Sequence, residues 1–319
     1  MGVIKNDLVD DSRLILEQKL ITRLFKTQDV TKVSKRIVEF IKEKVKELDR
    51  EGIIIGFSGG IDSALTLKLC VLAVGNDKVL ALYIPEKDSN PLHKKHAEKY
   101  AEELGVRFKV IDITPTLETL GIYKLIPTKI LGSRKLAGKL FRTYFKLSEN
   151  KFKESLGGSS NKFVRKGNAS SKTKHRIRMV ILYLFGSIKN LLVVGAANKT
   201  EGQIGFFAKW GVDHAADIMP IGCLYKTQVI ELARYLKVPK EIINKSPSPD
   251  LVPGITDEYV IGMPYEILDL ILFGIEKGLS VEKISSYLDV SPEKIERVLD
   301  WRKRSKHMRE SPYLPDFEF

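Results

Sequence analysis

The chain has 319 residues, of which 43% are apolar and 29% are charged, and its formal net charge is +13. This composition is typical of a globular protein with a substantial core, and it excludes a disordered or collagen-like chain. Two cysteines argue against a disulfide framework, no apolar run approaches the roughly 20 residues of a membrane span, and the N-terminus carries acids where a signal peptide needs an apolar stretch, so we expect a cytoplasmic protein.

Helices and strands alternate over the first third of the chain. Residues 11 to 50 carry apolar side chains at helical spacing and are expected to form N-terminal helices. Short links between alternating strands and helices predict right-handed crossovers, and therefore an α/β fold with a parallel sheet flanked by helices. The expected elements are a strand at 53–57, a helix at 62–75, a strand at 78–85, a helix ending at Gly105 and a strand at 107–114.

A strongly basic segment follows. Residues 124 to 178 contain 16 Lys or Arg and only 2 Glu, so this segment carries the whole net positive charge of the chain. Residues 157–163 read as a mobile loop, because they combine Gly, Ser and Asn. The segment is interpreted as a solvated insertion or as a lid over an anionic substrate. RNA binding is a third reading, but nucleic acid is not expected because no RNA-binding module is recognisable.

The remaining chain returns to the same alternation and then becomes helical. A helix at 172–188, a strand at 190–198 and a helix ending before Pro239 are expected, and the chain beyond residue 258 is predicted to be mostly helical. We interpret the whole chain as one domain with three parts. These are N-terminal helices at 12–50, an α/β core at 51–275 that holds the basic insertion 124–178, and a helical C-terminal extension with a tail at 276–319.

The strand at 53–57 ends in a motif that predicts phosphate binding. Ser58-Gly59-Gly60 follows the strand, and Asp62-Ser63 opens the next helix. Glycines allow the backbone N–H groups to approach a ligand closely, and the helix N-terminus adds further donors and a positive dipole end. Asp62 is well placed to hold Mg²⁺ against a phosphate. The motif is neither a Walker A loop nor the dinucleotide-binding Gly-x-Gly-x-x-Gly.

The Ser-Gly-Gly-x-Asp-Ser turn resembles the pyrophosphate loop of ATP pyrophosphatases. Two downstream stretches, "GAANKTEGQIGFFAKWGVDHAADIMPIGCLYKTQVIELARYLKVP" (195–239) and "KSPSPDLVPGITDEYVIGMPYEILDLIL" (245–272), resemble the synthetase domain of the NAD synthetase family. The resemblance covers roughly residues 30 to 275 and implies a reaction. ATP adenylates the carboxylate of nicotinic acid adenine dinucleotide, pyrophosphate leaves, and ammonia displaces AMP to give NAD.

The resemblance also implies partners and site residues. It implies ATP and Mg²⁺, ammonia that is free or delivered by a separate protein because no fused glutaminase domain is present, and a homodimer. Asp62, Glu201, Asp213 and Lys226 are the implied catalytic residues, with Asp62 and Glu201 as metal ligands. The implied ATP and phosphate contacts are Ser58, Gly59, Gly60, Asp62, Ser63, Lys226 and Ser248. The implied substrate contacts are Arg176, Lys209, Asp213, Asp217, Lys245 and Asp250.

The sequence departs from the family pattern near the expected dinucleotide site. Ala196 replaces a hydroxyl residue, Val212 is an extra residue before the Asp213 segment, and Met308 stands in the C-terminal motif. These departures leave open an ATP-dependent amide ligase that acts on a different carboxylate. A non-catalytic nucleotide sensor is less favoured, because both presumed metal ligands, Asp62 and Glu201, are present.

Overall fold

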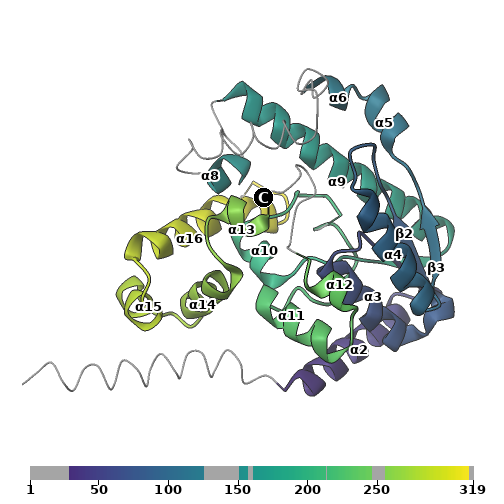
Figure 1. Cartoon of the computed structure of the whole chain (residues 1–319), viewed down its shortest axis with the longest axis horizontal. Helices are drawn as coiled ribbons and strands as arrows, with labels where there is room; N and C mark the ends of the chain where they lie inside the picture. The colour runs from purple at the N-terminus through teal and green to yellow at the C-terminus, as the bar shows by residue number, and fades with distance from the viewer. Residues whose placement is uncertain (1–28, 126–150, 157–160, 213, 246–255, 316–319) are drawn as a thin grey trace, which may run out of the picture.

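The computed structural model describes residues 29–125, 151–156, 161–212, 214–245 and 256–315. Within them, α-helices surround one parallel sheet, and a group of C-terminal helices packs to one side of it (Figure 1). This arrangement confirms the predicted α/β fold with a helical C-terminal region. None of the described helices is long and apolar enough to cross a membrane.

The described residues form a four-stranded sheet in the order β3-β2-β1-β4, and every strand pair is parallel. Because β2 and β3 lie on one side of β1 and β4 on the other, the winding direction reverses between β1 and β4. Ligands of open α/β sheets bind at such a reversal, outside the carboxyl ends of the strands. The strands are β1 (Gly52–Gly56), β2 (Val79–Tyr83), β3 (Arg107–Val110) and β4 (Leu191–Val194).

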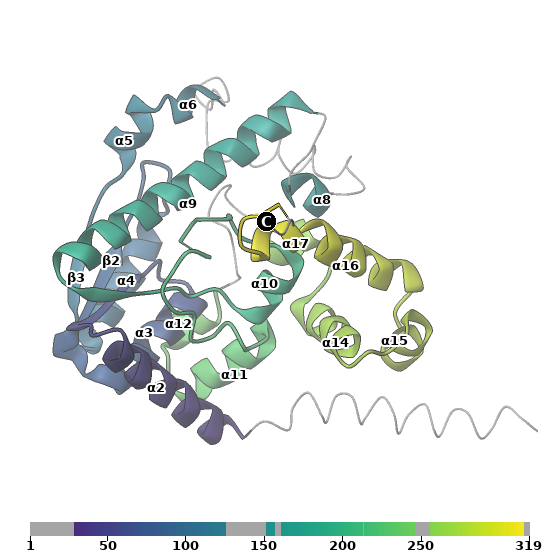
Figure 2. The same cartoon turned by 180° about the vertical axis from the view of Figure 1, so that it is seen from behind.

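Alternating side chains of β1 build two cores, one on each face of the sheet. Ile53 and Ile55 are fully buried in the first core, and Ile54 is fully buried in the second. The first face is covered by α2 (Val30–Glu47), α3 (Ile61–Val74), α4 (Pro91–Glu103) and α11 (Lys226–Tyr235). The other face is covered by α5 (Thr114–Thr119), α6 (Ile122–Leu125) and the long α9 (Lys162–Ile188), which lies across the strands in Figure 2.

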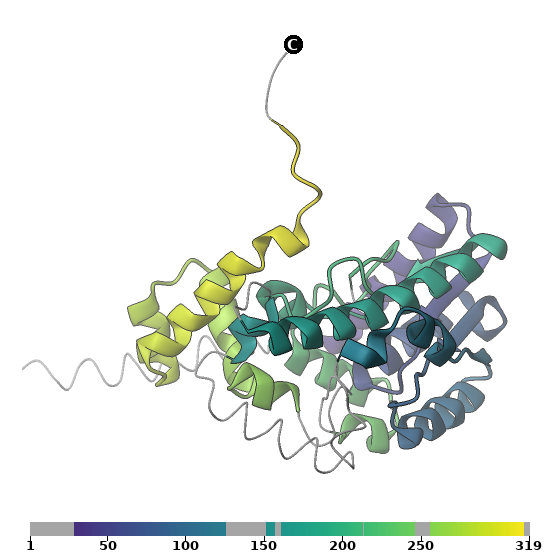
Figure 3. The ribbon, with the colours of Figure 1, turned by 90° about the horizontal axis from the view of Figure 1, so that it is seen from above.

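A third apolar core holds the C-terminal helices together. Trp301 is 2% exposed there, and its ring meets Phe152 edge to face with 4.8 Å between centroids. Beyond the last helix, residues 311–315 have no regular structure and leave the body of the molecule (Figure 3). The helices of this region are α8 (Lys151–Leu156), α10 (Lys199–Ile204), α13 (Asp257–Ile261), α14 (Tyr265–Glu276), α15 (Val281–Leu288), α16 (Pro292–Arg304) and α17 (Lys306–Arg309), and the short α12 (Lys240–Ile243) follows α11.

Several expectations about element boundaries were wrong. Helix α9 begins at Lys162 and not at residue 172, because Asn161 caps it by accepting hydrogen bonds from the backbone N–H groups of Phe163 and Val164. The loop expected at 157–163 therefore ends by Asn161, and residues 157–160 lie outside the described residues. The third and fourth strands are also shorter than expected, since β3 ends at Val110 and β4 at Val194.

Candidate active site

The predicted phosphate loop forms the turn between β1 and α3. Backbone N–H of Gly60 donates to Ser58 Oγ at 3.2 Å, and the hydroxyls of Ser58 and Ser63 lie 3.1 Å apart. Ser63 Oγ also donates to the Gly60 carbonyl at 3.0 Å. These bonds fix the turn at the N-terminus of α3, where the first N–H groups of the helix lack intrahelical acceptors.

Gly59 is required by this turn for two independent reasons. Its φ is +74°, in the left-handed region that favours glycine. A Cβ at this position would also stand 2.7 Å from the carbonyl oxygen of His93 at the start of α4. The loop is therefore pressed against α4, and no side chain fits between them.

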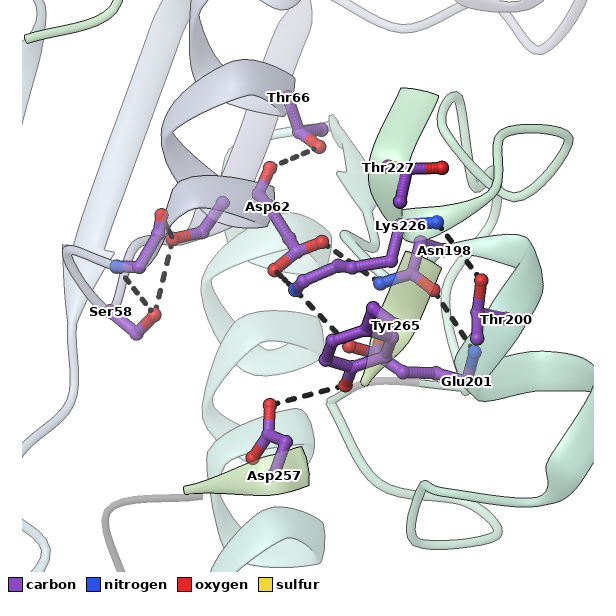
Figure 4. A network of polar contacts seen from close by, with 12 residues as sticks. Ser58, Asp62, Thr66, Asn198, Thr200, Glu201, Lys226, Thr227, Asp257 and Tyr265 are labelled. Carbon is purple, nitrogen blue, oxygen red and sulfur yellow. Dashed lines mark hydrogen bonds and ion pairs between the residues drawn. The ribbon is translucent and has the colours of Figure 1, made fainter. Parts of the chain in front are cut away.

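Three charged side chains from three segments meet beside the loop (Figure 4). Lys226 Nζ, from the first residue of α11, lies 2.5 Å from Asp62 Oδ2 in the first turn of α3. The same Nζ lies 3.6 Å from Glu201 Oε1 in α10. Asp62, Glu201 and Lys226, which the family resemblance assigns to one site, are thus brought together at the carboxyl ends of β1 and β4.

Lys226 is a buried cation, and its side chain is only 1% exposed. Burial by itself would lower the pKa of this ammonium, but the charges of Asp62 and Glu201 outweigh burial and hold the pKa above its usual value. Lys226 therefore stays charged at neutral pH. A fixed positive charge beside a phosphate loop is suited to neutralise a departing pyrophosphate.

Asn198 supports this group in a role that the sequence reasoning missed. Its Oδ1 caps α10 by accepting from the Glu201 N–H at 3.0 Å, and its Nδ2 donates to Asp62 Oδ1 at 2.9 Å. The Asn198 side chain thereby links the loop after β4 to the first turn of α3. The order Asn-x-x-Glu is a helix-start signal that marks Asn198 as a cap, but it does not reveal the contact with Asp62.

A third acid, Asp257, lies beneath the charged group formed by Asp62, Glu201 and Lys226 (Figure 4). Tyr265 OH donates to Asp257 Oδ2 at 3.3 Å, and the Tyr265 ring lies 5.5 Å from Lys226 Nζ. Burial raises the pKa of Asp257 to about 6, although the charge of Lys226 opposes this rise. No described residue donates a hydrogen bond to Asp257 Oδ1.

Two of the expected substrate residues, Arg176 and Lys209, lie in a separate cluster. Lys209 Nζ donates to the carbonyls of His307 and Glu310 at 2.6 and 3.2 Å, and Arg176 Nε donates to the Lys209 carbonyl at 3.1 Å. The C-terminal segment thus holds Lys209, and the Lys209 carbonyl in turn holds Arg176. Asp213, Ser248 and Asp250 lie outside the described residues.

Two further expected substrate residues lie apart from that cluster. Both carboxylate oxygens of Asp217 are engaged, since Oδ2 accepts from the Val193 N–H and Oδ1 accepts from Tyr183 OH. Asp217 therefore fastens the chain to the edge strand β4. Lys245 follows α12 near His96 of α4, whose pKa is lowered by burial and by the charge of Lys245.

The described part of the basic segment binds back onto the protein. Lys174 Nζ donates to the buried Glu86 at 2.9 Å, and Arg178 Nε donates to the Ile84 carbonyl at 2.8 Å, both just after β2. Phe152, one of the aromatic residues of the basic segment, is 2% exposed and packs in the C-terminal core. Phe152 therefore does not offer a free face to a nucleic-acid base. Residues 126–150 of the segment lie outside the described chain.

An all-parallel α/β sheet that carries a Ser-Gly-Gly-x-Asp-Ser turn and a buried lysine at its winding reversal defines a nucleotide-binding protein of the pyrophosphate-loop class. A family model described as NAD synthase matches residues 33–131 and 132–312. The chain belongs to the NAD synthase family.

Curated relatives resemble the chain over most of its length. It is 42% identical over 276 residues to an NH3-dependent NAD(+) synthetase of Thermotoga neapolitana, with 86% of this chain and 93% of the relative covered. It is 40% identical over 289 residues to an NH3-dependent NAD(+) synthetase of Methanocaldococcus jannaschii, with 91% and 98% covered. The match therefore spans almost the whole of each relative.

Solved structures agree with this assignment. The NMN synthetase from Francisella tularensis matches with a TM-score of 0.68 at 29% identity, covering 91% of this chain and all of that chain. The NH3-dependent NAD synthetase from Campylobacter jejuni matches with a TM-score of 0.63 at 27% identity, with the same coverage. Both matches include the C-terminal helices, because they cover nearly the full chain.

Proposed function

We propose that this protein is an ammonia-dependent NAD synthetase that uses ATP to amidate nicotinic acid adenine dinucleotide. The nicotinate carboxylate attacks the α-phosphorus of ATP, the bond to the β-phosphate breaks, and pyrophosphate leaves. Ammonia then attacks the activated carbonyl carbon, AMP leaves with the bonding electron pair, and the nitrogen loses a proton. The observation that carries the proposal is the meeting of Asp62, Glu201 and Lys226 beside the phosphate loop.

The loop and Lys226 supply what a departing pyrophosphate needs. Ser58 and Ser63 present hydroxyls, and the N-terminus of the 14-residue α3 presents N–H groups and a positive dipole end. An ammonium has three donors, of which one is directed to Asp62, so Lys226 retains donors for a phosphate oxygen. We assign binding of the β- and γ-phosphates to Ser58, Gly59, Gly60, Ser63 and Lys226.

Mg²⁺ fits the donor set of Asp62 and Glu201. No group of three or more His, Cys, Asp or Glu side chains positioned to hold a metal ion occurs among the described residues. Mg²⁺ commonly binds through one or two carboxylates, with phosphate oxygens and water as its other ligands, so this pair is sufficient. When bound, the ion would neutralise phosphate charge and polarise the α-phosphate.

We assign the dinucleotide to the other expected residues. Arg176 and Lys209 are cations joined by the hydrogen bond from Arg176 to the Lys209 carbonyl, and they suit the negative charges of a dinucleotide. Asp213, Asp217, Lys245, Ser248 and Asp250 remain predicted contacts for the dinucleotide, the ammonia and the ATP. A cytoplasmic location also remains a prediction, and Cys70 and Cys223 are both free thiols.

We propose a homodimer in which α9 contributes to the interface. Val180, Leu184 and Ile188 are 63%, 54% and 69% exposed and recur every four residues, so they form one apolar stripe on the outer side of α9. Three large apolar side chains in a row on a surface helix are typical of a face that another protein covers. A second copy of this chain is the occupant that the family resemblance implies.

The test is a chromatographic assay with nicotinic acid adenine dinucleotide, ATP, Mg²⁺ and ammonium chloride. AMP and NAD are expected in equal amounts, and neither is expected when ammonium is replaced by sodium. A parallel reaction offers nicotinic acid mononucleotide in place of the dinucleotide, and comparing the two reactions shows which compound the enzyme amidates. If AMP forms only with the mononucleotide, or with neither compound, the proposed acceptor is wrong.

A further inference from the structure

Asp269 is a completely buried carboxylate that the proposed chemistry does not use. It lies in the middle of α14, in the apolar run "YEILDLILFGIE", and is 0% exposed. A buried charge is costly unless hydrogen bonds compensate for it, so its donors show what it holds.

Three donors converge on Asp269, and they come from two different helices. Thr200 Oγ1 in α10 donates to Oδ1 at 2.5 Å. The backbone N–H and the hydroxyl of Thr227 in α11 both donate to Oδ2 at 2.8 Å. Each threonine stands next to a residue of the charged group, since Thr200 precedes Glu201 and Thr227 follows Lys226.

The hydroxyl of Thr200 connects the two helices directly. Because its only proton goes to Asp269, its oxygen is left to accept, and it accepts from the backbone N–H of Lys226 at 2.9 Å. The first turns of α10 and α11 are therefore tied to each other and to one carboxylate. A negative charge is also favourable at these two helix N-termini.

The same helix repeats this bridge on its exposed side. Glu276 lies seven residues after Asp269, and its carboxylate accepts from Lys199 Nζ in α10 at 2.8 Å and from the hydroxyl of Tyr225, the residue just before α11. Two acids of α14 thus span the same pair of helix starts. Asp269 is the inner one, and it acts on the residues adjacent to the site.

We propose that Asp269 is a positioning residue for catalysis, which sets the placement of Lys226 and Glu201 around Asp62 through Thr200 and Thr227. The proposal rests on the proposed function, because it assigns those three charged residues to the transfer chemistry. A displacement of about 1 Å in such a group lowers rates by about 100-fold, so the bridge has a catalytic consequence separate from stability.

Four variants separate positioning from simple stabilisation. Asp269→Asn and Thr200→Val weaken or remove the bridge to Lys226, whereas Thr200→Ser keeps the hydroxyl. Ile271→Ala removes a fully buried side chain from the same helix and the same C-terminal core without touching the bridge, so it is the matched stability control. Each variant is assayed for kcat and for KM of ATP, well below its own melting temperature, and melting is followed by circular dichroism.

We expect Asp269→Asn and Thr200→Val to lower kcat by 10- to 100-fold, while Thr200→Ser and Ile271→Ala keep at least half of it. A fifth protein that combines Asp269→Asn with Thr200→Val is expected to be no slower than Asp269→Asn alone, because both changes break one bridge. Equal kcat in Asp269→Asn and wild type would overturn the proposal. So would a loss in Ile271→Ala that matches the loss in Asp269→Asn at a similar melting temperature.

Binding of magnesium pyrophosphate, measured by calorimetry, keeps this test independent of the acceptor. Asp269→Asn is expected to bind it at least fivefold more weakly than Ile271→Ala does, and equal affinities would count against positioning. If the wild-type protein itself forms no NAD, the proposed function fails, and the comparison of pyrophosphate affinities still decides the role of Asp269.

Discussion

Lys226 Nζ and Asp62 Oδ2 lie 2.5 Å apart, although 164 residues separate them in the chain. Asp62 lies in the first turn of α3, which follows β1, and Lys226 begins α11, which follows β4 in the chain. Their contact therefore closes the phosphate site from the two sides of the winding reversal. Because Lys226 is buried, the contact is held in a low-dielectric environment where each charge depends on the other.

Replacing Lys226 with Met is expected to damage both stability and activity. The change keeps much of the side-chain volume but leaves Asp62 and Glu201 without their cation. Loss of one partner of a buried ion pair costs about 3 kcal/mol of unfolding free energy, and loss of a preorganised charge lowers kcat by about 100-fold or more. Urea unfolding and the NAD assay measure the two effects.

Lys99→Met is the matched control, because Lys99 pairs with Glu241 at 2.8 Å on the exposed surface. It is expected to change neither the urea midpoint nor kcat, since exposed ion pairs contribute little. If Lys226→Met behaved like Lys99→Met, the buried charge would have no role in either property.

Gly59→Ala is expected to abolish pyrophosphate binding and to destabilise the fold. The new Cβ would meet the His93 carbonyl oxygen at 2.7 Å while φ is +74°, so the loop must shift away from α4. Gly121→Ala is the control, because Gly121 has a similar φ of +67° but no atom within 4 Å of the added Cβ. Calorimetric titration with pyrophosphate and urea unfolding of both variants isolate the clash from the backbone strain. Retention of pyrophosphate affinity in Gly59→Ala would contradict the loop assignment.

Asp257→Asn is expected to stabilise the protein more at pH 8 than at pH 4. Burial raises the pKa of Asp257 to about 6 in the folded state, against 3.8 for an ordinary aspartate. The carboxyl therefore contributes a stability that is fully present below pH 3.8 and is lost as the pH rises through 6. An asparagine side chain is neutral at every pH, so its contribution to the unfolding free energy does not change between pH 4 and pH 8.

The difference in unfolding free energy between Asp257→Asn and wild type should therefore shift by about 2 kcal/mol in favour of the variant between pH 4 and pH 8. Urea unfolding at several pH values measures it. A difference that stays constant with pH, or that shifts in favour of wild type, would show that Asp257 is not held with a raised pKa.

Leu184→Arg is expected to convert the proposed homodimer to a monomer. It places a charge in the centre of the apolar stripe on α9, between Val180 and Ile188. Leu120→Arg, at a residue that is 55% exposed after α5, is the control and should leave the assembly unchanged. Sedimentation velocity gives the masses, and a Leu184→Arg protein that still sediments as a dimer would place the interface elsewhere.

The strand and turn around the phosphate loop were predictable because their signals are local. An apolar run followed by two glycines gives β1 and the loop, and the helix that follows begins at Ile61, within one residue of the expected start. The start of α9 was not predictable in this way. Gly167 and the serines after it are poor helix formers, yet they lie within α9, because the helix already begins at the Asn161 cap.

The site was only partly predictable. Glu201 and Lys226 were identified through a family resemblance, and nothing in the spacing of residues 62, 201 and 226 indicates that they meet. Asp269 left a weaker signal, because an acid with two apolar residues on each side, as in Ile267-Leu268-Asp269-Leu270-Ile271, predicts a buried carboxylate with dedicated donors. Its donors, Thr200 and Thr227, were not predictable, since they depend on how three helices pack.

The bridge from α14 to the starts of α10 and α11 also limits how far this protein can be shortened. The chain up to α11 contains every residue expected to touch pyrophosphate except Ser248, and this suggests a minimal catalytic fragment that ends soon after α11. Such a fragment would lack Asp269 and would leave Thr200 and Thr227 without their shared acceptor. The C-terminal helices thus support the proposed phosphate site, and we expect a chain that lacks them to lose activity.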